Sequence, residues 1–132
     1  MQPRIVHDER GSSPVEFVLV GSLLTVLTLA VLQLGLAVYV RNVVHDAAVE
    51  GAHYAALADT TLQDGAERTA SVIATAVGGA YAEDITVSSG EELGHPVAVV
   101  TVRTMLPVLG LIGIPFALEV EANAPMESLG EE

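Results

Sequence analysis

An uncharged segment near the N-terminus constrains this chain more than any other feature. The 24 residues 17–40 contain no charged side chain and consist mainly of Val, Leu and Ala. As a helix rising about 1.5 Å per residue they extend about 36 Å, enough to cross a hydrocarbon core of about 30 Å. A chain of 132 residues has too little other sequence to bury so uniformly apolar a helix. The segment 37–41 offers no small-x-small exit of the kind that follows a secretory signal. We therefore predict a transmembrane anchor over residues 17–40.

The charge balance narrows the class of partner. Five Lys and Arg residues stand against 17 Asp and Glu residues, which gives a formal net charge of −12, and Cys is absent. An acidic surface repels phosphate backbones, so we expect no nucleic-acid partner. Disulfide scaffolds and thiolate metal sites are excluded, and the length allows one small domain at most.

The orientation of the anchor follows from the charges on its two sides. Arg4 and Arg10 precede the segment, Arg41 follows it, and most acidic residues lie beyond it. This balance favours a cytoplasmic N-terminus and a C-terminal domain outside, in a single-pass protein.

The helical period continues past the membrane segment. Small and apolar residues recur there at spacings of three or four: Val40, Val44, Ala47, Gly51, Ala55 and Ala58. We therefore expect a helix over residues 12–58, with a small-residue face that permits close packing. A second helix is predicted from the capping box Thr61–Asp64 to the stop at Gly78 and Gly79. Its expected apolar stripe is Leu62, Ala66, Ala70, Ile73 and Val77.

The period changes to two after Tyr81, which indicates β-strands. Strands are expected over residues 85–88 and 96–103, and residues 118–124 alternate apolar and polar side chains. The predicted fold class is α+β, with a long N-terminal transmembrane helix continuing into a small domain over residues 59–125. That domain would hold a second helix and about three antiparallel strands. The leader 1–11 and the acidic tail 126–132 are expected to be disordered.

The segment 105–116 contains no charged or hydrogen-bonding side chain. Pro107, Pro115 and two glycines argue against a helix or a central strand, so an irregular loop is expected. One possibility is that it folds back over the sheet or the Gly51 region of the helix. The other is that it stays available to a second subunit or to the outer membrane leaflet, because a surface loop this apolar would expose a large patch. The candidate partner-contact residues are then Leu109, Leu111 and Ile112.

No combination of side chains suggests catalysis. Glu50 and His53 resemble half of a di-iron helix motif, but no second pair stands at a matching position. His45 and His53 are eight residues apart on one expected helix, about 12 Å along its axis, too far to share a metal. We expect no catalytic, cofactor-binding or metal site.

The junction before the apolar segment carries the most specific motif. A short charged leader, then Gly11, then four residues, then Glu16 and Phe17 opening an apolar helix resembles the processing site of type IV pilin-like proteins. The stretches 41–48 and 50–56, and more weakly 99–102 and 106–107, resemble the TadE family, pseudopilins of the tight-adherence (Flp) pilus system. His53 departs from the family, which often carries arginine there.

This resemblance implies cleavage after Gly11 by a prepilin peptidase, which would leave Ser12 as the new N-terminus. It implies a bacterial cytoplasmic membrane location and, after assembly, a place in the pilus. The implied partners are the prepilin peptidase, other pilins or pseudopilins, the assembly platform and the lipid bilayer. A glycine before the scissile bond would let extended backbone enter a narrow protease site.

Glu16 has two compatible interpretations. In the first, Ser13 to Glu16 is a capping box with Pro14 at the first helical position. In the second, the carboxylate at the edge of hydrocarbon pairs with the new α-amine of Ser12, on the same chain or on a neighbour.

The sequence thus predicts a non-enzymatic TadE-like pseudopilin that acts as a structural or assembly component of a Flp-type pilus. The alternative is a permanent single-pass anchor that presents an extracytoplasmic ligand-binding domain.

Overall fold

The computed structural model describes residues 1–3, 11–108 and 112–128. Helix α1 covers Ser12–Ala56 and helix α2 covers Leu62–Ala76, followed by the 3-10 helix η2 at Gly79–Tyr81. Strands β1 (Asp84–Glu92), β2 (His95–Val108) and β3 (Ile112–Pro125) form an antiparallel sheet in the order β1-β2-β3. This arrangement confirms the predicted α+β fold class.

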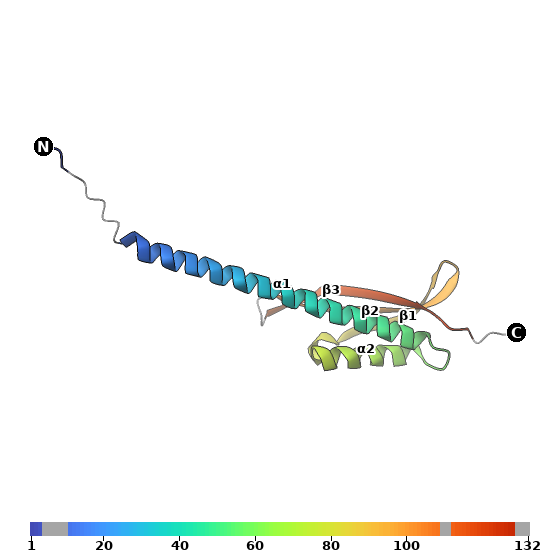
Figure 1. Cartoon of the computed structure of the whole chain (residues 1–132). Helices are drawn as coiled ribbons and strands as arrows, with labels where there is room; N and C mark the ends of the chain where they lie inside the picture. The colour runs from blue at the N-terminus through green and yellow to red at the C-terminus, as the bar shows by residue number, and fades with distance from the viewer. Residues whose placement is uncertain (4–10, 109–111, 129–132) are drawn as a thin grey trace.

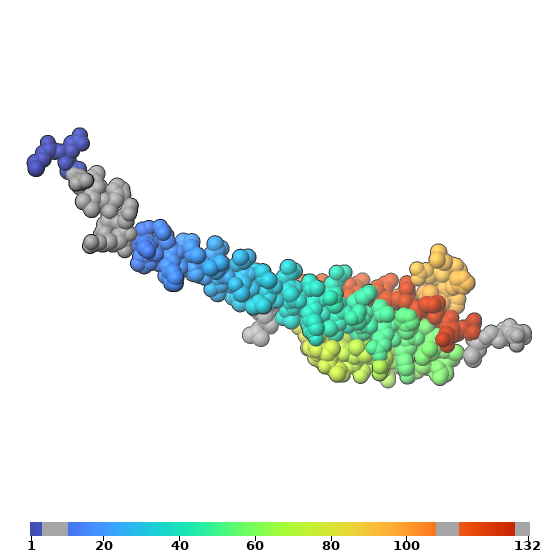
Figure 2. Space-filling model, viewed as in Figure 1, coloured from blue at the N-terminus to red at the C-terminus, as the bar shows by residue number. Residues whose placement is uncertain are grey.

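The molecule is a small helix-on-sheet domain with a long helical extension. The C-terminal half of α1 packs over β2 and β3, α2 packs beside it over β1, and the N-terminal half of α1 projects away from the rest (Figure 1). In the space-filling view this projecting half stands bare of the other elements (Figure 2). One helix therefore belongs to two environments.

Burial along α1 begins at Val40. Its buried residues are Val40, Val44, Ala47, Ala48, Gly51, Ala52, Ala55 and Ala56. The predicted small-residue face is thus the packed face, although α1 ends at Ala56, and Ala58 is exposed in the following turn. Because most of these side chains are methyl groups or hydrogen, the helix axis lies close to both the sheet and α2.

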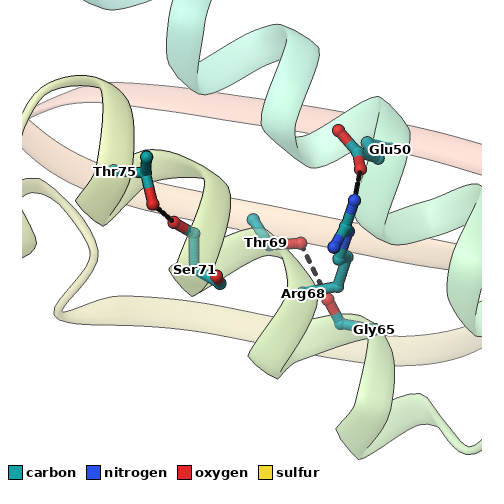
Figure 3. Close-up of polar contacts among 6 residues, drawn as sticks. All are labelled: Glu50, Gly65, Arg68, Thr69, Ser71 and Thr75. Atoms are coloured by element: carbon teal, nitrogen blue, oxygen red, sulfur yellow. Dashed lines mark hydrogen bonds and ion pairs between the residues drawn. The ribbon is translucent and has the colours of Figure 1, made fainter.

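The two helices meet at a pair of glycines. A Cβ atom on Gly51 would lie 2.9 Å from the Gly65 carbonyl oxygen and would collide with the Thr69 hydroxyl, whereas one on Gly65 would lie 2.8 Å from the Gly51 carbonyl oxygen. The Thr69 hydroxyl, fully buried here, donates to the Gly65 carbonyl at 2.9 Å (Figure 3). The backbones of α1 and α2 are therefore in direct contact, which only glycine allows at both positions.

An ion pair lies at the rim of this crossing. Arg68 Nε on α2 donates to Glu50 Oε1 on α1 at 2.8 Å, and Arg68 Nη2 donates to the same oxygen (Figure 3). Both side chains are about half exposed, so solvent screens the pair and its contribution to stability is small. Its position helps to fix how α2 is rotated on α1.

Helix α2 begins as predicted. The Thr61 backbone N–H donates to Asp64 Oδ2 at 2.7 Å, and the Asp64 backbone N–H donates to Thr61 Oγ1 at 3.2 Å, which completes the capping box. At the other end, the backbone N–H of Gly78, at φ 109°, donates to the Ile73 carbonyl. The buried residues of α2 are Gly65, Thr69 and Ile73. Of the predicted stripe, Ile73 is therefore buried, whereas Leu62, Ala66, Ala70 and Val77 are half-buried beside this line. The close contact at Gly65 orients α2 so that Gly65 and Thr69 face α1.

The inner face of the sheet completes the core. The register aligns Val87 with Val100 and Ala122, and Ile85 with Val102 and Val120. These side chains face α1 and α2, whereas Glu119, Glu121 and Asn123 alternate outward, as the period of β3 predicted.

The expected irregular loop at 105–116 is wrong for the residues that the structure describes. Residues up to Val108 extend β2 and residues from Ile112 extend β3, paired as Val108 with Ile112 and Pro107 with Gly113. Pro107 is tolerated because pairing with β1 stops at Arg103, so β2 has one neighbouring strand beyond that point. All three strands are longer than the short strands expected.

A bulge explains the second proline. Thr104 pairs with Leu118 and Leu106 with Ile114, so Met105 alone stands opposite Pro115, Phe116 and Ala117. Phe116 has φ 56°, in the left-handed region that non-glycine residues rarely adopt. The irregularity anticipated from two prolines is therefore concentrated in one bulge of a hairpin.

The start of the C-terminal tail is also more ordered than expected. The backbone N–H of Met126 donates to the Pro96 carbonyl at 2.9 Å, and that of Glu127 donates to the Ala56 carbonyl at 2.8 Å. The second bond ties the end of β3 to the end of α1. Residues 129–132 lie outside the described residues, as do residues 4–10 of the leader.

The glycine crossing predicts a large effect from one methyl group. Gly51→Ala and Gly65→Ala should each lower the free energy of unfolding by about 1–3 kcal/mol, because the added Cβ has to displace backbone. Gly21→Ala is the matched control, since that glycine is also in α1 but has nothing within 4 Å. Thermal unfolding of the detergent-solubilised chain measures the difference. Equal melting temperatures for Gly51→Ala and Gly21→Ala would contradict the close crossing.

The capping box predicts a pH dependence. Hydrogen bonds from the Thr61 backbone and hydroxyl hold the pKa of Asp64 below its ordinary value of 3.8. A folded-state pKa below the unfolded one means that the stabilisation is present above the unfolded value and is lost as pH falls through the folded one. The stability advantage of wild type over Asp64→Asn should therefore be constant near neutrality and shrink in acid. Denaturant unfolding of both proteins across this range measures it, and a gap independent of pH would refute the assignment.

Candidate functional site

The candidate processing site lies where α1 begins. Gly11 is the N-cap residue, with φ −90° and ψ −15°, and α1 starts at Ser12. A Cβ on Gly11 would meet nothing within 4 Å, and its φ is open to any residue. The fold of this chain therefore does not require glycine at position 11.

Glu16 contacts the residue that would follow the scissile bond. The Ser12 hydroxyl donates to Glu16 Oε1 at 2.7 Å, one helical turn away, and both side chains are exposed. The predicted capping box from Ser13 does not form, because Ser13 and Pro14 are already inside α1 and the Gly11 cap makes no side-chain hydrogen bond. The Glu16 carboxylate is thus held beside Ser12, and not on the Ser13 amide.

The projecting half of α1 has the surface of a membrane helix. Every residue from Ser12 to Tyr39 is exposed except Gln33 and Ala37, which are half-buried, and Phe17 lies within this surface. The hydroxyls of Ser22, Thr25 and Thr28 each donate to the carbonyl four residues earlier, at 2.7–2.8 Å. These three hydroxyls are thereby satisfied within the helix, as a lipid environment demands, whereas the Gln33 side-chain oxygen is buried without a hydrogen-bond partner among the described residues. The helix is long and apolar enough to cross a membrane.

The two histidines on α1 are exposed and lie apart. His53 Nδ1 lies 2.8 Å from the Val49 carbonyl of its own helix, and His45 lines a shallow hollow with Arg41 and Glu119. Glu50, three residues before His53 in α1, forms an ion pair with Arg68 of α2. Among residues 1–3, 11–108 and 112–128, no three His, Asp or Glu side chains are placed to hold a metal ion.

The candidate partner-contact residues are only partly covered by the structure. Leu109 and Leu111 lie outside the described residues. Ile112 is the first residue of β3 and pairs with Val108. The expectation that these three residues contact a partner stays a prediction.

Comparison with known proteins supports the resemblance drawn from the motif. The family model described as TadE-like protein matches residues 11–53, about a third of the chain. The match begins at Gly11, crosses the exposed half of α1 and ends inside its packed half. No curated protein and no solved structure matched the chain. The TadE-like resemblance is therefore confirmed over these residues, and it indicates a component associated with the Tad pilus.

We did not predict from the sequence that charged residues of β2, β3 and α1 lie close together. Arg103 Nε on β2 donates to Glu119 Oε2 on β3 at 2.7 Å, and Glu119 lines the same hollow as Arg41 of α1. The ion pair, mainly through its hydrogen bond, raises the pKa of Arg103. The sequence offers one signal for this arrangement: Arg41 directly follows the uncharged segment 17–40, and Arg103 and Glu119 directly flank the uncharged segment 104–118.

Proposed function

We propose that this protein is a membrane-anchored pseudopilin, cleaved after Gly11 by a prepilin peptidase, that serves as a structural or assembly component of a Flp-type pilus. The observation that carries the proposal is the TadE-like match, which starts at Gly11 and follows α1 through its bare, apolar half. In this proposal α1 crosses the cytoplasmic membrane once, with the N-terminus inside and the sheet domain outside.

The surface of α1 supports the membrane placement. A helix whose apolar side chains are exposed all around has no protein core to enter, and hydrocarbon is the solvent that accepts such a surface. The buried face starts at Val40, and the first charge after the uncharged segment is Arg41. The change from lipid-facing to protein-facing helix thus coincides with the end of the uncharged segment.

The conformation around Gly11 supports a role in a partner's active site. Since neither space nor backbone angle requires glycine there, the constraint on this position would come from outside the chain. A protease that binds extended backbone in a narrow cleft supplies such a constraint, because a missing Cβ permits closer approach. The helical start at Ser12 would unwind locally to enter that cleft.

The place of Glu16 supports a role after cleavage. Cutting the Gly11–Ser12 bond creates an α-amine on the residue whose hydroxyl already contacts Glu16. An ammonium and a carboxylate near the membrane surface attract strongly when neither has another partner. The pairing would occur within one chain or between neighbouring subunits, and the latter would align their helices during assembly.

The proposed mechanism is helix packing without catalysis. The membrane would hold the subunit until the assembly platform and other pilins or pseudopilins receive it. The bilayer and the prepilin peptidase complete the proposed partners.

Maturation is tested by changing Gly11. Gly11→Leu should accumulate as a precursor that still inserts in the membrane, because the bulky side chain blocks the protease while α1 is untouched. Gly21→Leu makes the same change ten residues later, where space is open, and should be processed normally. Intact mass and N-terminal sequence of the membrane-extracted protein give the result. An uncleaved leader on wild-type protein, in cells with an active peptidase, would favour the permanent-anchor alternative.

The role of Glu16 is tested with charge-matched variants. Glu16→Gln keeps hydrogen-bonding capacity but loses the charge attraction, so processing should survive while pilus assembly is lost. Glu16→Asp retains the charge and should restore part of the assembly. Pilus yield and leader mass are measured for both strains, beside a deletion strain that establishes the requirement for this protein. Normal pilus yield from Glu16→Gln would reject the pairing.

A further inference from the structure

The membrane side of the sheet domain is uncharged on three elements at once. Residues 17–40 of α1 and 104–118 of the β2–β3 hairpin carry no charged side chain. Glu16 borders the first segment at its N-terminal end, and the other three bordering residues are Arg41, Arg103 and Glu119. Arg103 and Glu119 are joined by an ion pair, and Glu119 and Arg41 line one hollow. The uncharged segments of α1, β2 and β3 therefore end at the same height along the α1 axis, where Arg41, Arg103 and Glu119 lie together.

The hairpin extends from that level toward the bare half of α1. Strand β3 runs parallel to α1, because Glu119 lies beside Arg41 and the N–H of Glu127 bonds to the Ala56 carbonyl. Glu119 pairs with Arg103 and Ile114 pairs with Leu106, so Ile114 lies three steps of β2, about 10 Å, from the level of Glu119, which equals about seven residues of helix. Ile114 is thus expected near the level of Leu34, and Phe116 lies in the bulge between Ile114 and Glu119. Figure 1 shows β2 and β3 running back along α1 in this direction.

The burial of α1 agrees with this estimate. Gln33 and Ala37 are half-buried and continue the line of Val40 and Val44, although their neighbours on the helix are exposed. The Gln33 side-chain oxygen has less than 1 Å² of accessible surface. The partly buried line of α1 therefore extends about two helical turns from Val40 toward the N-terminus, into the expected membrane segment.

The outward face of the hairpin there is apolar and open. Ile114 is 50% exposed and Phe116 is 69% exposed, while Leu106 and Pro107 on β2 are more buried. Phe116 has φ 56°, a left-handed backbone conformation that is unfavourable for an L-residue. A strained backbone and an exposed aromatic ring at a bulge do not stabilise the fold, and such features cluster at functional sites.

We propose that this hairpin end, comprising residues 105–107 and 114–117, lies in the outer interfacial layer of the lipid bilayer, as a second membrane contact beside α1. Lipid is the occupant because the patch continues the exposed surface of α1 without an intervening charge. Phe116 also lines a hollow with Glu83, Asp84 and Arg103, which places it at the polar boundary, with Ile114 beyond it. Aromatic residues favour this depth, where an apolar ring meets headgroups.

The backbone of the hairpin limits how deep it can enter. Beyond Arg103 the β2 strand has one partner strand, so its other edge carries unpaired N–H and C=O groups that hydrocarbon would penalise. Pro107 and Pro115 contribute no N–H, and one face of the hairpin lies on α1, both of which reduce that cost. The balance favours the interface over the bilayer centre. Two contacts would then fix the tilt and rotation of the sheet domain on the membrane, which a single helix leaves free.

The chain contains no Trp, so single-Trp variants report their own depth. The full chain is placed in phosphatidylcholine vesicles, neutral because the protein is acidic, with lipids brominated at shallow or deep acyl positions. The variants are Phe116→Trp, Ile114→Trp, Leu93→Trp and Val26→Trp. Leu93 is a matched control, since it is 95% exposed and has φ 51° at the β1–β2 turn, at the other end of the strands. Val26 reports on the transmembrane segment itself.

Trp at positions 114 and 116 should show blue-shifted emission and several-fold stronger quenching by shallow bromines than Trp at 93, whereas Trp at 26 should respond to deep bromines. Positions 114 and 116 as unquenched as 93, with 26 quenched, would overturn the proposal and leave the proposed function standing. Blue-shifted but unquenched emission that depends on protein concentration would also overturn it, in favour of a second copy of the chain. Because the inference rests on the proposed anchoring of α1, an unquenched Trp at 26 would overturn both.

Discussion

A single unbroken helix has to satisfy two solvents, and the rest of the structure follows from that constraint. Over residues 12–32 α1 exposes apolar side chains on all sides, Gln33 and Ala37 are half-buried, and from Val40 the helix buries one face against protein. The helix cannot change its backbone at the transition, so the change is made by side chains alone. Bulky Val and Leu residues face outward in the first half, and Ala and Gly residues face inward in the second.

The small residues of the second half determine how the domain is built around the helix. Gly51 and Gly65 bring α1 and α2 into backbone contact, and Thr69 fills the groove beside them with its hydroxyl satisfied within α2. Ala98, Ala122 and Ala124 on the facing strands allow the sheet to approach the distal part of α1 in the same way. A core of methyl groups buries little area per residue, so its stability depends on close fit more than on bulk.

Charge placement complements this packing at the membrane end. Arg41, Arg103 and Glu119 come from three elements that are distant in sequence, yet they lie at one level of the domain. Beyond that level none of the three elements carries a charged side chain until Glu16, at the far end of the uncharged helix. The domain and its helix thus share one boundary between charged and uncharged surface, which a flexible linker between them would not produce.

The sequence by itself determined the elements whose signals are local. The uncharged length of 17–40, the Thr61–Asp64 capping box and the alternation of 118–124 each depend on neighbouring residues, so pattern reasoning found all three. The Gly11–Phe17 motif was equally local, and the TadE-like match over 11–53 supports it. The predicted Ser13 capping box was wrong because α1 begins at Ser12, two residues before the predicted first helical residue, Pro14. With this earlier start, Glu16 contacts the Ser12 hydroxyl.

Only the tertiary structure decided the features that join distant segments. The hairpin at 105–116 has no period of its own, since its prolines, glycines and apolar residues fit a loop as well as a strand. It becomes a strand pair because α1 covers one face and β1 ends early enough to tolerate Pro107. The buried line of α2 and the common level of Arg41, Arg103 and Glu119 likewise depend on which backbones touch. The pattern that forms a helix or strand depends on residues close together in sequence. The contacts between helices and strands are determined only when the whole chain packs.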